Sequence, residues 1–447
     1  MTAALVFQLS SFLVSVALVP LILGFLSLAE FLVWVVFTTI GGLTLQLEAA
    51  IQVFMVRRAA RRAADRDGIG FRAEVEKSRS AYRILVGAIV LVVLPLGWLF
   101  LSDHLSGQQQ LTQNAGLAWI VFVVAYAINY SFGPNNVMLL STARTDSYYW
   151  LGTVSRIAYF LLALFALQGG FGLLGLAAAF LVAAILNVLG LARLARNVRI
   201  DEPGQRNGID VSPDALSAAS GSVNLVRYTL FTLAGFLVYR GAFLLAVDLF
   251  PPADAAAYGL ALQAYAIMAA AASLSIHVKL HHLAVAIRDN DHRREAEEVA
   301  GGLLFAFATL AIGTVVLVIA GPWILALIGS EVRLPATAVL GLLAAAFMIE
   351  VAVIMLINPM LLRSDVSFAI PYVGIAMLAI AMAAVAALAN APLAAAMVAV
   401  PLLVQLLVNL PAIFWAGAKS RGLGALAYLG ALAAATPAAA DRLRRWN

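Results

Sequence analysis

The sequence has no cysteine and few charged residues. Without cysteine among its 447 residues, disulfides, thiolate metal sites and cysteine nucleophiles are excluded. Charged residues make up only 11% of the chain, whereas a soluble domain carries about a quarter. Hydrophobic residues amount to 63%, which is more than one globular core can bury. The composition therefore predicts a membrane protein.

Motifs of nucleotide binding and metal catalysis are absent as well. The sequence contains no Walker loop, no HExxH motif and no Rossmann fingerprint. His277 and His281 have the spacing of a metal-binding pair on a helix, but no acidic third ligand is nearby, so we interpret HVKLHH as a basic cluster. The net charge of +5 is spread over loops, which argues against a nucleic-acid partner. We expect no metal, no cofactor and no enzymatic activity.

Long apolar segments are what the chain has in abundance. An α-helix needs about 20 residues to cross about 30 Å of hydrocarbon. Twelve segments reach this length: 3–27, 31–55, 81–102, 116–140, 147–168, 171–194, 223–249, 256–277, 299–327, 334–361, 367–389 and 392–417. The sequence thus predicts an all-α polytopic membrane protein with twelve transmembrane helices.

The positions of lysine and arginine support this count. Of the 28 basic residues, all but Arg156, Arg240 and Arg333 fall on one side, in the loops or at the span ends. Positively charged loops stay in the cytoplasm, so both termini are predicted to be cytoplasmic. The first segment lacks a basic n-region, and we interpret it as an uncleaved span. The outer loops are short and leave no room for a soluble catalytic domain.

The long polar connection after the sixth span divides the chain into two halves. We predict an N-terminal six-helix lobe at 1–195, a cytoplasmic linker at 196–222, a C-terminal six-helix lobe at 223–417 and a basic cytoplasmic tail at 418–447. Within the tail, 422–437 is short for a span and is expected to lie at or near the interface. Because six spans precede the second half, both halves have the same orientation.

The two halves share a faint internal repeat. Glu30 matches Asp254, and Trp34 matches Tyr258, at a spacing of 224 residues. Since the halves have the same orientation, such a repeat is parallel, about an axis along the membrane normal.

Four ionisable residues lie deep within predicted spans: Glu48, Arg156, Arg240 and Glu350. Each costs at least about 2.5–3.5 kcal/mol if it faces lipid, so each should face a partner or a water-filled cavity. One interpretation pairs Glu48 with Arg156 and Glu350 with Arg240, and side-chain reach favours the first pair. The other interpretation places Arg240 in a cavity, where its guanidinium binds an anion such as a diphosphate.

Two further basic residues lie at the predicted inner ends of spans. Arg227 and Lys279 could recruit the same anion, or they could simply contact lipid headgroups. The candidate binding residues are therefore Arg240, Arg156, Arg227 and Lys279. Glu48, Glu350 and Asp248 are candidates for ion coupling or for internal pairing.

The pattern of spans and three sequence segments also resemble a known superfamily. The segments LVPLILGFLSLAEFLVWVVFTT, YRGAFLLAVDLFPPADAAAYGLALQAYAIM and LALIGSEVRLPATAVLGLL, in twelve spans of two halves, resemble the polysaccharide-transporter branch of the multidrug/oligosaccharidyl-lipid/polysaccharide (MOP) flippases. Among these, the chain is similar to Wzx-type O-antigen and exopolysaccharide flippases.

The resemblance implies two six-helix lobes in a MATE-like, V-shaped bundle around a central cavity. It implies a bacterial inner-membrane protein that moves an undecaprenyl diphosphate-linked oligosaccharide from the cytoplasmic to the periplasmic leaflet by alternating access. It places the first, second, seventh and eighth spans along the cavity, and Arg240 with them. The fifth span, which contains Arg156, is not expected at the centre, so the resemblance gives weaker support for a role of Arg156. The implied partners are this lipid-linked glycan, membrane lipids, a polysaccharide polymerase and glycosyltransferases.

Two other functions stay open. A multidrug/cation antiporter of the same fold would use acidic residues to exchange H⁺ or Na⁺, and Glu48, Glu350 and Asp248 are compatible with it. A membrane-embedded polysaccharide polymerase or ligase uses the same lipid-linked substrate. Such enzymes generally carry a large outer loop with basic and catalytic residues, which this sequence lacks.

Overall fold

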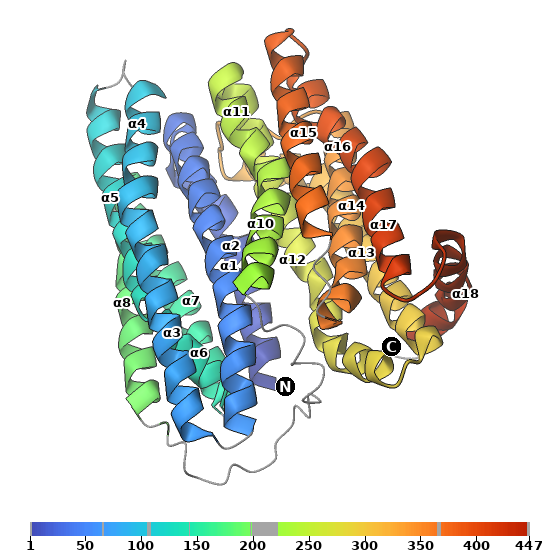
Figure 1. The fold of residues 1–447 in the computed structure, drawn as a ribbon. Coiled ribbons are helices and arrows are strands. Elements are labelled where there is room, and N and C mark those ends of the chain that lie inside the picture. Colours follow the sequence, from blue (N-terminus) through green and yellow to red (C-terminus); the bar gives the residue numbers. More distant parts are fainter. Residues whose placement is uncertain are drawn as a thin grey trace. The chain divides into compact units, whose positions relative to one another are not determined.

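A computed structural model describes residues 2–64, 67–104, 109–142, 144–196, 198, 222–363 and 368–444. Helices form nearly all of this part of the chain, and no strand occurs in it (Figure 1). The predicted linker at 196–222 lies almost entirely outside the described residues. The helical part divides into two compact units, residues 1–208 with 325–332, and residues 209–324 with 333–447.

The first unit consists of helices joined by short turns. Its helices are α1 (Thr2–Phe25), α2 (Leu28–Ala64), α3 (Gly68–Ala88), the π-helical turn η1 (Ile89–Val93), α4 (Leu94–His104), α5 (Gln109–Ser131), α6 (Gly133–Leu140), α7 (Thr145–Gln168) and α8 (Gly172–Arg196). The turn between α7 and α8 depends on Gly170 and Gly172, whose positive φ values of 76° and 50° suit glycine. Pro134 lies in the first turn of α6, where proline is favoured, and α6 is a separate helix from α5.

The second unit contains three π-helical turns. Its elements are α10 (Ser222–Phe236), η2 (Leu237–Gly241), α11 (Ala242–Leu249), α12 (Pro252–Arg288), α13 (His292–Leu327), α14 (Thr337–Leu362), α15 (Ala369–Leu388), η3 (Ala394–Ala399), α16 (Val400–Val404), η4 (Gln405–Asn409), α17 (Leu410–Lys419) and α18 (Ala425–Arg444). A π turn inserts one residue into a continuous helix and rotates the side chains that follow it. Here such turns interrupt the first and the last span of the unit.

Helix boundaries repeat with the 224-residue spacing predicted from Glu30 and Asp254. The pairs Leu28 and Pro252, Gly68 and His292, and Thr145 and Ala369 begin corresponding helices, and the members of each pair are 224 residues apart. Helices α2 and α12 both have 37 residues. The two halves therefore share one plan of helix lengths and turns.

The described helices account for the predicted transmembrane segments. Eleven are long and apolar enough to cross a membrane. The continuous run of α10, η2 and α11, from Ser222 to Leu249, corresponds to the remaining predicted span. The all-α fold is thus confirmed, and the helices indicate a multi-pass membrane protein. At 1.5 Å per residue, α2 and α12 are about 55 Å long, so both extend well beyond about 30 Å of hydrocarbon.

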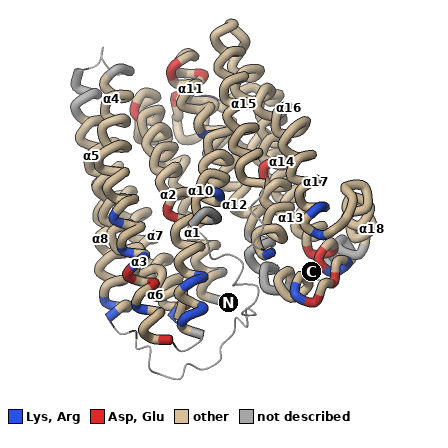
Figure 2. Tube along the Cα trace, in the orientation of Figure 1, with Lys and Arg blue, Asp and Glu red and all other residues tan. Residues whose placement is uncertain are grey.

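Surface and core are arranged as in a membrane-embedded bundle. Large apolar side chains point outward: Leu91 is 77% exposed and Ile319 is 72% exposed. In the first unit, Phe37, Trp119 and Phe122 pack together with ring centroids 5.1–6.2 Å apart. Figure 2 shows that Lys and Arg of this unit gather at the end where α2 ends and α3 begins.

Candidate functional site in the membrane-spanning helices

Arg240 lies on the π-helical turn η2, between α10 and α11. Its side chain is half-buried, and the guanidinium carbon is 5.4 Å from the centroid of the Phe236 ring, one helical turn earlier. A cation at this distance over an aromatic face gains a favourable electrostatic contact. Gly241 follows directly and leaves the backbone beside the guanidinium without a side chain. The position predicted from sequence thus coincides with an irregular turn, a feature frequent at functional sites.

Glu350 on α14 lies within electrostatic range of Arg240. Its side chain is half-buried. The carboxylate is also close enough to Tyr372 on α15 for a charge interaction. In the second unit, a carboxylate, a guanidinium and a phenol are therefore neighbours within the apolar helices, where opposite charges reduce the cost of desolvation.

Tyr372 connects this group to the last span. Its ring is 5% exposed and packs on Phe231, with centroids 4.7 Å apart. Its hydroxyl forms a hydrogen bond with Asn409 on the π turn η4. Asn409 Nδ2 in turn donates to Gln405 Oε1. Gln405 Nε2 and Asn409 Oδ1 are buried and have no hydrogen-bond partner among the described residues.

Glu48 forms the corresponding polar centre of the first unit. This α2 residue is 7% exposed, and its Oε1 accepts hydrogen bonds from Tyr82 Oη at 2.9 Å and from Gln52 Nε2 at 3.2 Å. Tyr148 on α7 hydrogen-bonds to Gln52 and lies within electrostatic range of Glu48. Two neutral donors thus satisfy Oε1 of this buried carboxylate, as buried polar groups require.

Tyr148 and Tyr372 occupy equivalent positions in the two units. They are 224 residues apart, on α7 and α15, whose first residues have the same separation. Each tyrosine lies beside the membrane carboxylate of its own unit. The internal repeat therefore includes these two tyrosines, whereas the carboxylates are not equivalent, because Glu48 is on α2 and Glu350 is on α14.

The other predicted residues lie in varied surroundings. Arg156 is exposed on α7, within electrostatic range of Tyr148 and Tyr159, and makes no ion pair with Glu48 in the described part of the chain. Arg227 is half-buried in α10, and Asp248 is exposed in the last turn of α11. Lys279 belongs to α12, but its side chain, like those of His277 and His281, lies outside the described residues. Their roles in binding stay predictions.

Sequence reasoning that considered only charged residues missed the neutral members of the site: Tyr82, Tyr148, Tyr372, Gln405 and Asn409. The signal was present, because Gln405 and Asn409 are polar residues four apart in an apolar span and share a helix face. Tyrosine gave a weaker signal, since it is common at membrane interfaces without any function.

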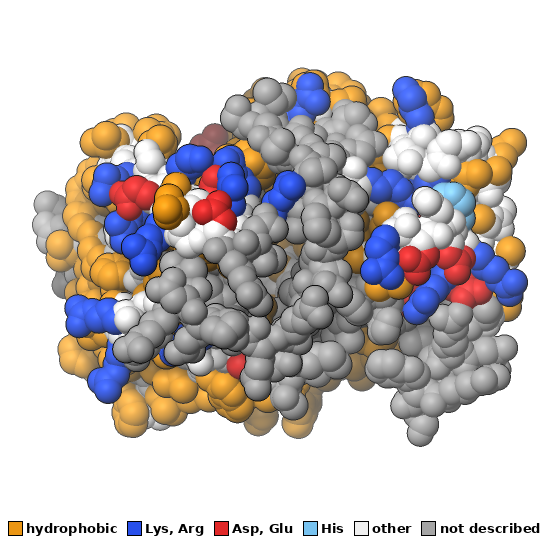
Figure 3. Space-filling view, turned by 60° about the horizontal axis from the view of Figure 1, so that its bottom comes forward, with side chains coloured by type: hydrophobic (Ala, Val, Ile, Leu, Met, Phe, Trp, Pro, Cys, Tyr) orange, Lys and Arg blue, Asp and Glu red, His pale blue; other side chains and the backbone are white. Residues whose placement is uncertain are grey.

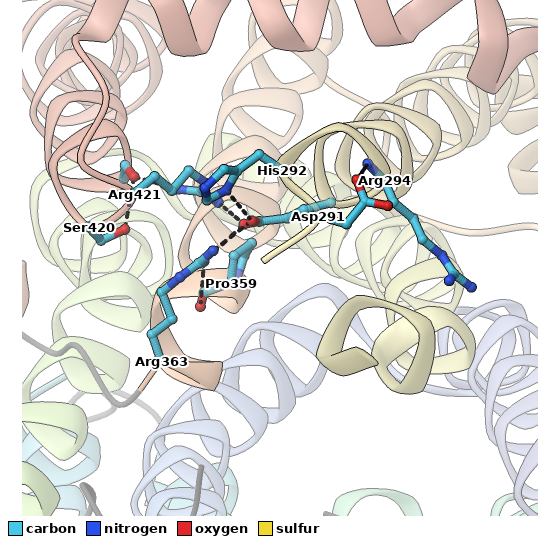
Figure 4. A network of polar contacts seen from close by, with 9 residues as sticks. Asp291, His292, Arg294, Pro359, Arg363, Ser420 and Arg421 are labelled. Atoms are coloured by element: carbon cyan, nitrogen blue, oxygen red, sulfur yellow. Dashed lines mark hydrogen bonds and ion pairs between the residues drawn. The ribbon is translucent and has the colours of Figure 1, made fainter. Parts of the chain in front are cut away.

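A second polar centre lies at the helix ends of the second unit (Figure 4). Glu295, in the first turn of α13, is 1% exposed and accepts hydrogen bonds from Arg363 Nη1 at 2.9 Å and Nη2 at 2.6 Å. Arg421, which follows α17, donates to the same carboxylate. His292 Nδ1 is 3.8 Å from Glu295 Oε2. One carboxylate thereby joins the ends of three helices.

The final helix is attached through the same centre. The Arg421 guanidinium lies 4.2 Å from the centroid of the Tyr428 ring, in the first turns of α18. Burial raises the pKa of Tyr428 to about 12, so the phenol stays neutral at physiological pH. Ala435 of α18 packs against Ala296 and Ala300 of α13. The predicted tail segment is therefore a helix docked on α13.

Comparisons with known proteins address the fold. No protein-family model and no curated protein matches the sequence. Several solved structures are similar. An inward-facing multidrug resistance MATE-family transporter of the MOP superfamily has a TM-score of 0.65 and 13% identity, over 92% of this chain and 94% of that one. An outward-facing structure of such a transporter has a TM-score of 0.57 and 14% identity, over 94% and 95%.

A third similar structure is a MOP-superfamily transporter from Pyrococcus furiosus. It has a TM-score of 0.51 and 15% identity, over 99% of this chain and 95% of that one. Its binding pocket is described as having reverse polarity, which suggests a different function. Together, the helix order, the repeat and these similarities show that the chain has the fold of the MATE-family transporters of the MOP superfamily.

Proposed function

We propose that this protein is a flippase that moves an undecaprenyl diphosphate-linked oligosaccharide from the cytoplasmic to the periplasmic leaflet by alternating access. The observation that carries the proposal is the placement of Arg240, a half-buried cation on a π turn in the middle of the first span of the second unit. The fold supports a transporter, since the similar structures include transporters in inward-facing and outward-facing conformations.

The energetics of the substrate determine what the protein has to supply. Diphosphate and sugars cannot cross hydrocarbon unaided, whereas a polyprenyl tail is soluble in it. A guanidinium offers a diphosphate two parallel hydrogen bonds, which no other side chain can match. In this mechanism Arg240 holds the diphosphate, the units change conformation around the headgroup, and the tail stays in lipid.

Glu350 suits a transport site because it competes with the substrate for Arg240. The attraction between the two side chains weakens the hold of Arg240 on an anion, so that the diphosphate is released after crossing. Arg227 and Lys279 are proposed to recruit the anion at the inner end of the helices, and Arg156 is a further candidate contact. A MOP-superfamily transporter with a pocket of reverse polarity provides a precedent for variation in pocket charge.

The proposal includes a location and partners. We place the protein in the bacterial inner membrane with both termini in the cytoplasm, because basic residues gather at the adjoining ends of α2 and α3. Its partners are the lipid-linked glycan, membrane lipids, a polysaccharide polymerase and glycosyltransferases. H⁺ or Na⁺ is the candidate coupling ion, with Glu48, Glu350 and Asp248 as candidate sites.

A multidrug/cation antiporter is the second candidate function. The observation that favours it is the enclosed Glu48, held by Tyr82 and Gln52, because a carboxyl group in such surroundings can exchange a proton or a cation. The similar structures described as multidrug resistance transporters are compatible with this alternative.

Deletion of the gene separates these functions. For a flippase, the lipid-linked oligosaccharide accumulates on the inner leaflet, as measured by its accessibility to membrane-impermeant reagents in oriented vesicles. Unpolymerised units that face outward would instead indicate a polymerase or ligase. An unchanged glycan together with increased sensitivity to cationic drugs would identify the antiporter and exclude the flippase.

A further inference from the structure

A pocket in the first unit lies between α3 and the junction of α5 and α6. Its volume is about 520 Å³. Arg79, Tyr82 and Arg83 line it from α3, and Ser131 and Asn135 line it from the junction. The α3 residues share one face, because they are three and four positions apart. Arg240, Glu350 and Tyr372 are not among the described residues that line this pocket.

The shape of the pocket depends on the helix break. Helix α5 ends at Ser131 and α6 begins at Gly133, with Pro134 next to it. A Cβ atom on Gly133 would lie 2.0 Å from the Tyr82 ring, so only glycine allows Tyr82 to cross the junction in this position. Tyr82 is held there by its hydrogen bond to Glu48. The floor of the pocket is therefore a fixed part of the unit.

The pocket is cationic. Arg83 is exposed and makes no ion pair in the described part of the chain. Arg79 pairs with Glu76 at 2.7 Å, but both side chains are more than half exposed, and such pairs contribute only about 0–1 kcal/mol. The amide of Asn135 and the hydroxyl of Ser131 add neutral donors. None of the described residues that line the pocket is acidic.

The surroundings of the pocket are apolar. Val86 lines the pocket, and Val90, one turn further along the same face, is 42% exposed. Such a surface on a transmembrane helix contacts lipid tails. Arg79 and Arg83 lie toward the basic end of α3, where the headgroups of the cytoplasmic leaflet are expected. Figure 3 shows this end of the molecule, with Lys and Arg side chains next to apolar ones.

We propose that this pocket binds the phosphate-bearing headgroup of an anionic lipid of the cytoplasmic leaflet. Two guanidinium groups bind the phosphate oxygens, Asn135 donates to the remaining polar atoms of the headgroup, and the acyl chains lie along the apolar surface of α3. A membrane lipid fits better than a soluble phosphate, because only a lipid contacts the apolar surface as well as the arginines.

Native mass spectrometry of the full-length protein tests the proposal with phosphatidylglycerol as the probe and phosphatidylcholine as the zwitterionic comparison. The wild type should retain phosphatidylglycerol more strongly. The double variant Arg79→Gln with Arg83→Gln should lose about tenfold in phosphatidylglycerol affinity, equivalent to about 1.4 kcal/mol, and the two lysine substitutions should retain part of it. The matched control is Arg193→Gln with Arg196→Gln, which removes two basic residues from the end of α8.

Further outcomes decide against the proposal. Equal losses of phosphatidylglycerol affinity in the pocket variant and in the α8 control would show that the effect comes from general surface charge. Binding of inorganic phosphate alone at the same arginines, with equal displacement of lipid, would identify a soluble anion as the ligand. If the arginine variant does not fold, Ser131→Trp fills the pocket from an exposed position and keeps both arginines, and unchanged lipid retention in it overturns the proposal.

Discussion

Glu350 on α14 lies within electrostatic range of Arg240 on the π turn η2. The two residues are more than a hundred positions apart in the chain, yet they are opposite charges in the same unit of apolar helices. Their attraction lowers the cost of placing each charge in the membrane. Arg240 is half-buried and is followed by a glycine.

Substitution of Arg240 tests the proposed anion site. Arg240→Ala should abolish translocation of the lipid-linked oligosaccharide, because the diphosphate loses its guanidinium, while the amount of protein in the membrane stays the same. Arg240→Lys should keep part of the activity, since a point charge remains without the fork. The measurement is transport in proteoliposomes, with Arg294→Ala as an exposed control. Normal transport by Arg240→Ala would refute the assignment.

A double-mutant cycle measures the coupling of Arg240 and Glu350. Glu350→Gln alone leaves a cation in apolar surroundings and should reduce stability by about 1–3 kcal/mol. The combination with Arg240→Gln should cost less than the sum of the single substitutions, by about 0.5–3 kcal/mol, since neutral groups then replace both charges. Chemical unfolding in detergent provides the free energies. Strictly additive effects would show that the two side chains do not interact.

Gly133 should tolerate no side chain. Gly133→Ala forces the Tyr82 ring to move, and this breaks its hydrogen bond to Glu48, so we expect a loss of about 1–3 kcal/mol. Gly374→Ala on α15 is the matched control, because a Cβ atom there meets open space, and it should stabilise the helix by up to about 1 kcal/mol. Thermal unfolding of both variants checks the difference, and equal midpoints would contradict the packing described for Tyr82.

The carboxylate of Glu295 should be important for the stability of the second unit. Glu295→Ala leaves Arg363 and Arg421 without their shared partner, and breaking a buried pair in this way costs about 3–5 kcal/mol. Asp289→Asn is the control, because its pair with Arg288 is half exposed and worth about 0–1 kcal/mol. Unfolding monitored in the presence of detergent should show a large effect for Glu295 alone. A small effect would mean that water replaces the carboxylate.

The arrangement of the helices could be predicted from sequence to a large extent. Apolar length identifies a span because hydrocarbon thickness fixes the number of residues needed, whereas the side predicted from the basic loops stays a prediction. The match of Glu30 with Asp254 gave the 224-residue spacing at which Leu28 and Pro252 begin corresponding helices. The sequence did not reveal the π turns, because an extra residue shifts the helix face, and such a shift leaves no trace where the residues are apolar on every side, as in IVLVV and AAAMVA.

The partners of buried charges could be predicted much less well. Side-chain reach favoured Glu48 with Arg156, whereas in the structure Glu48 accepts hydrogen bonds from Tyr82 and Gln52. Span position gives the depth of a residue in the membrane but not the direction in which its side chain points. That direction depends on how each helix is rotated and tilted against its neighbours, and packing decides both.

The sequence by itself determined that this protein is a bundle of membrane-spanning helices in two similar halves, because composition, apolar length and charge placement act locally along the chain. Only the tertiary structure decided that Glu295 joins Arg363 to Arg421, that Tyr148 and Tyr372 lie beside the two membrane carboxylates, and that Gly133 makes room for Tyr82. These contacts link residues far apart in sequence, and they form only when whole helices pack side by side.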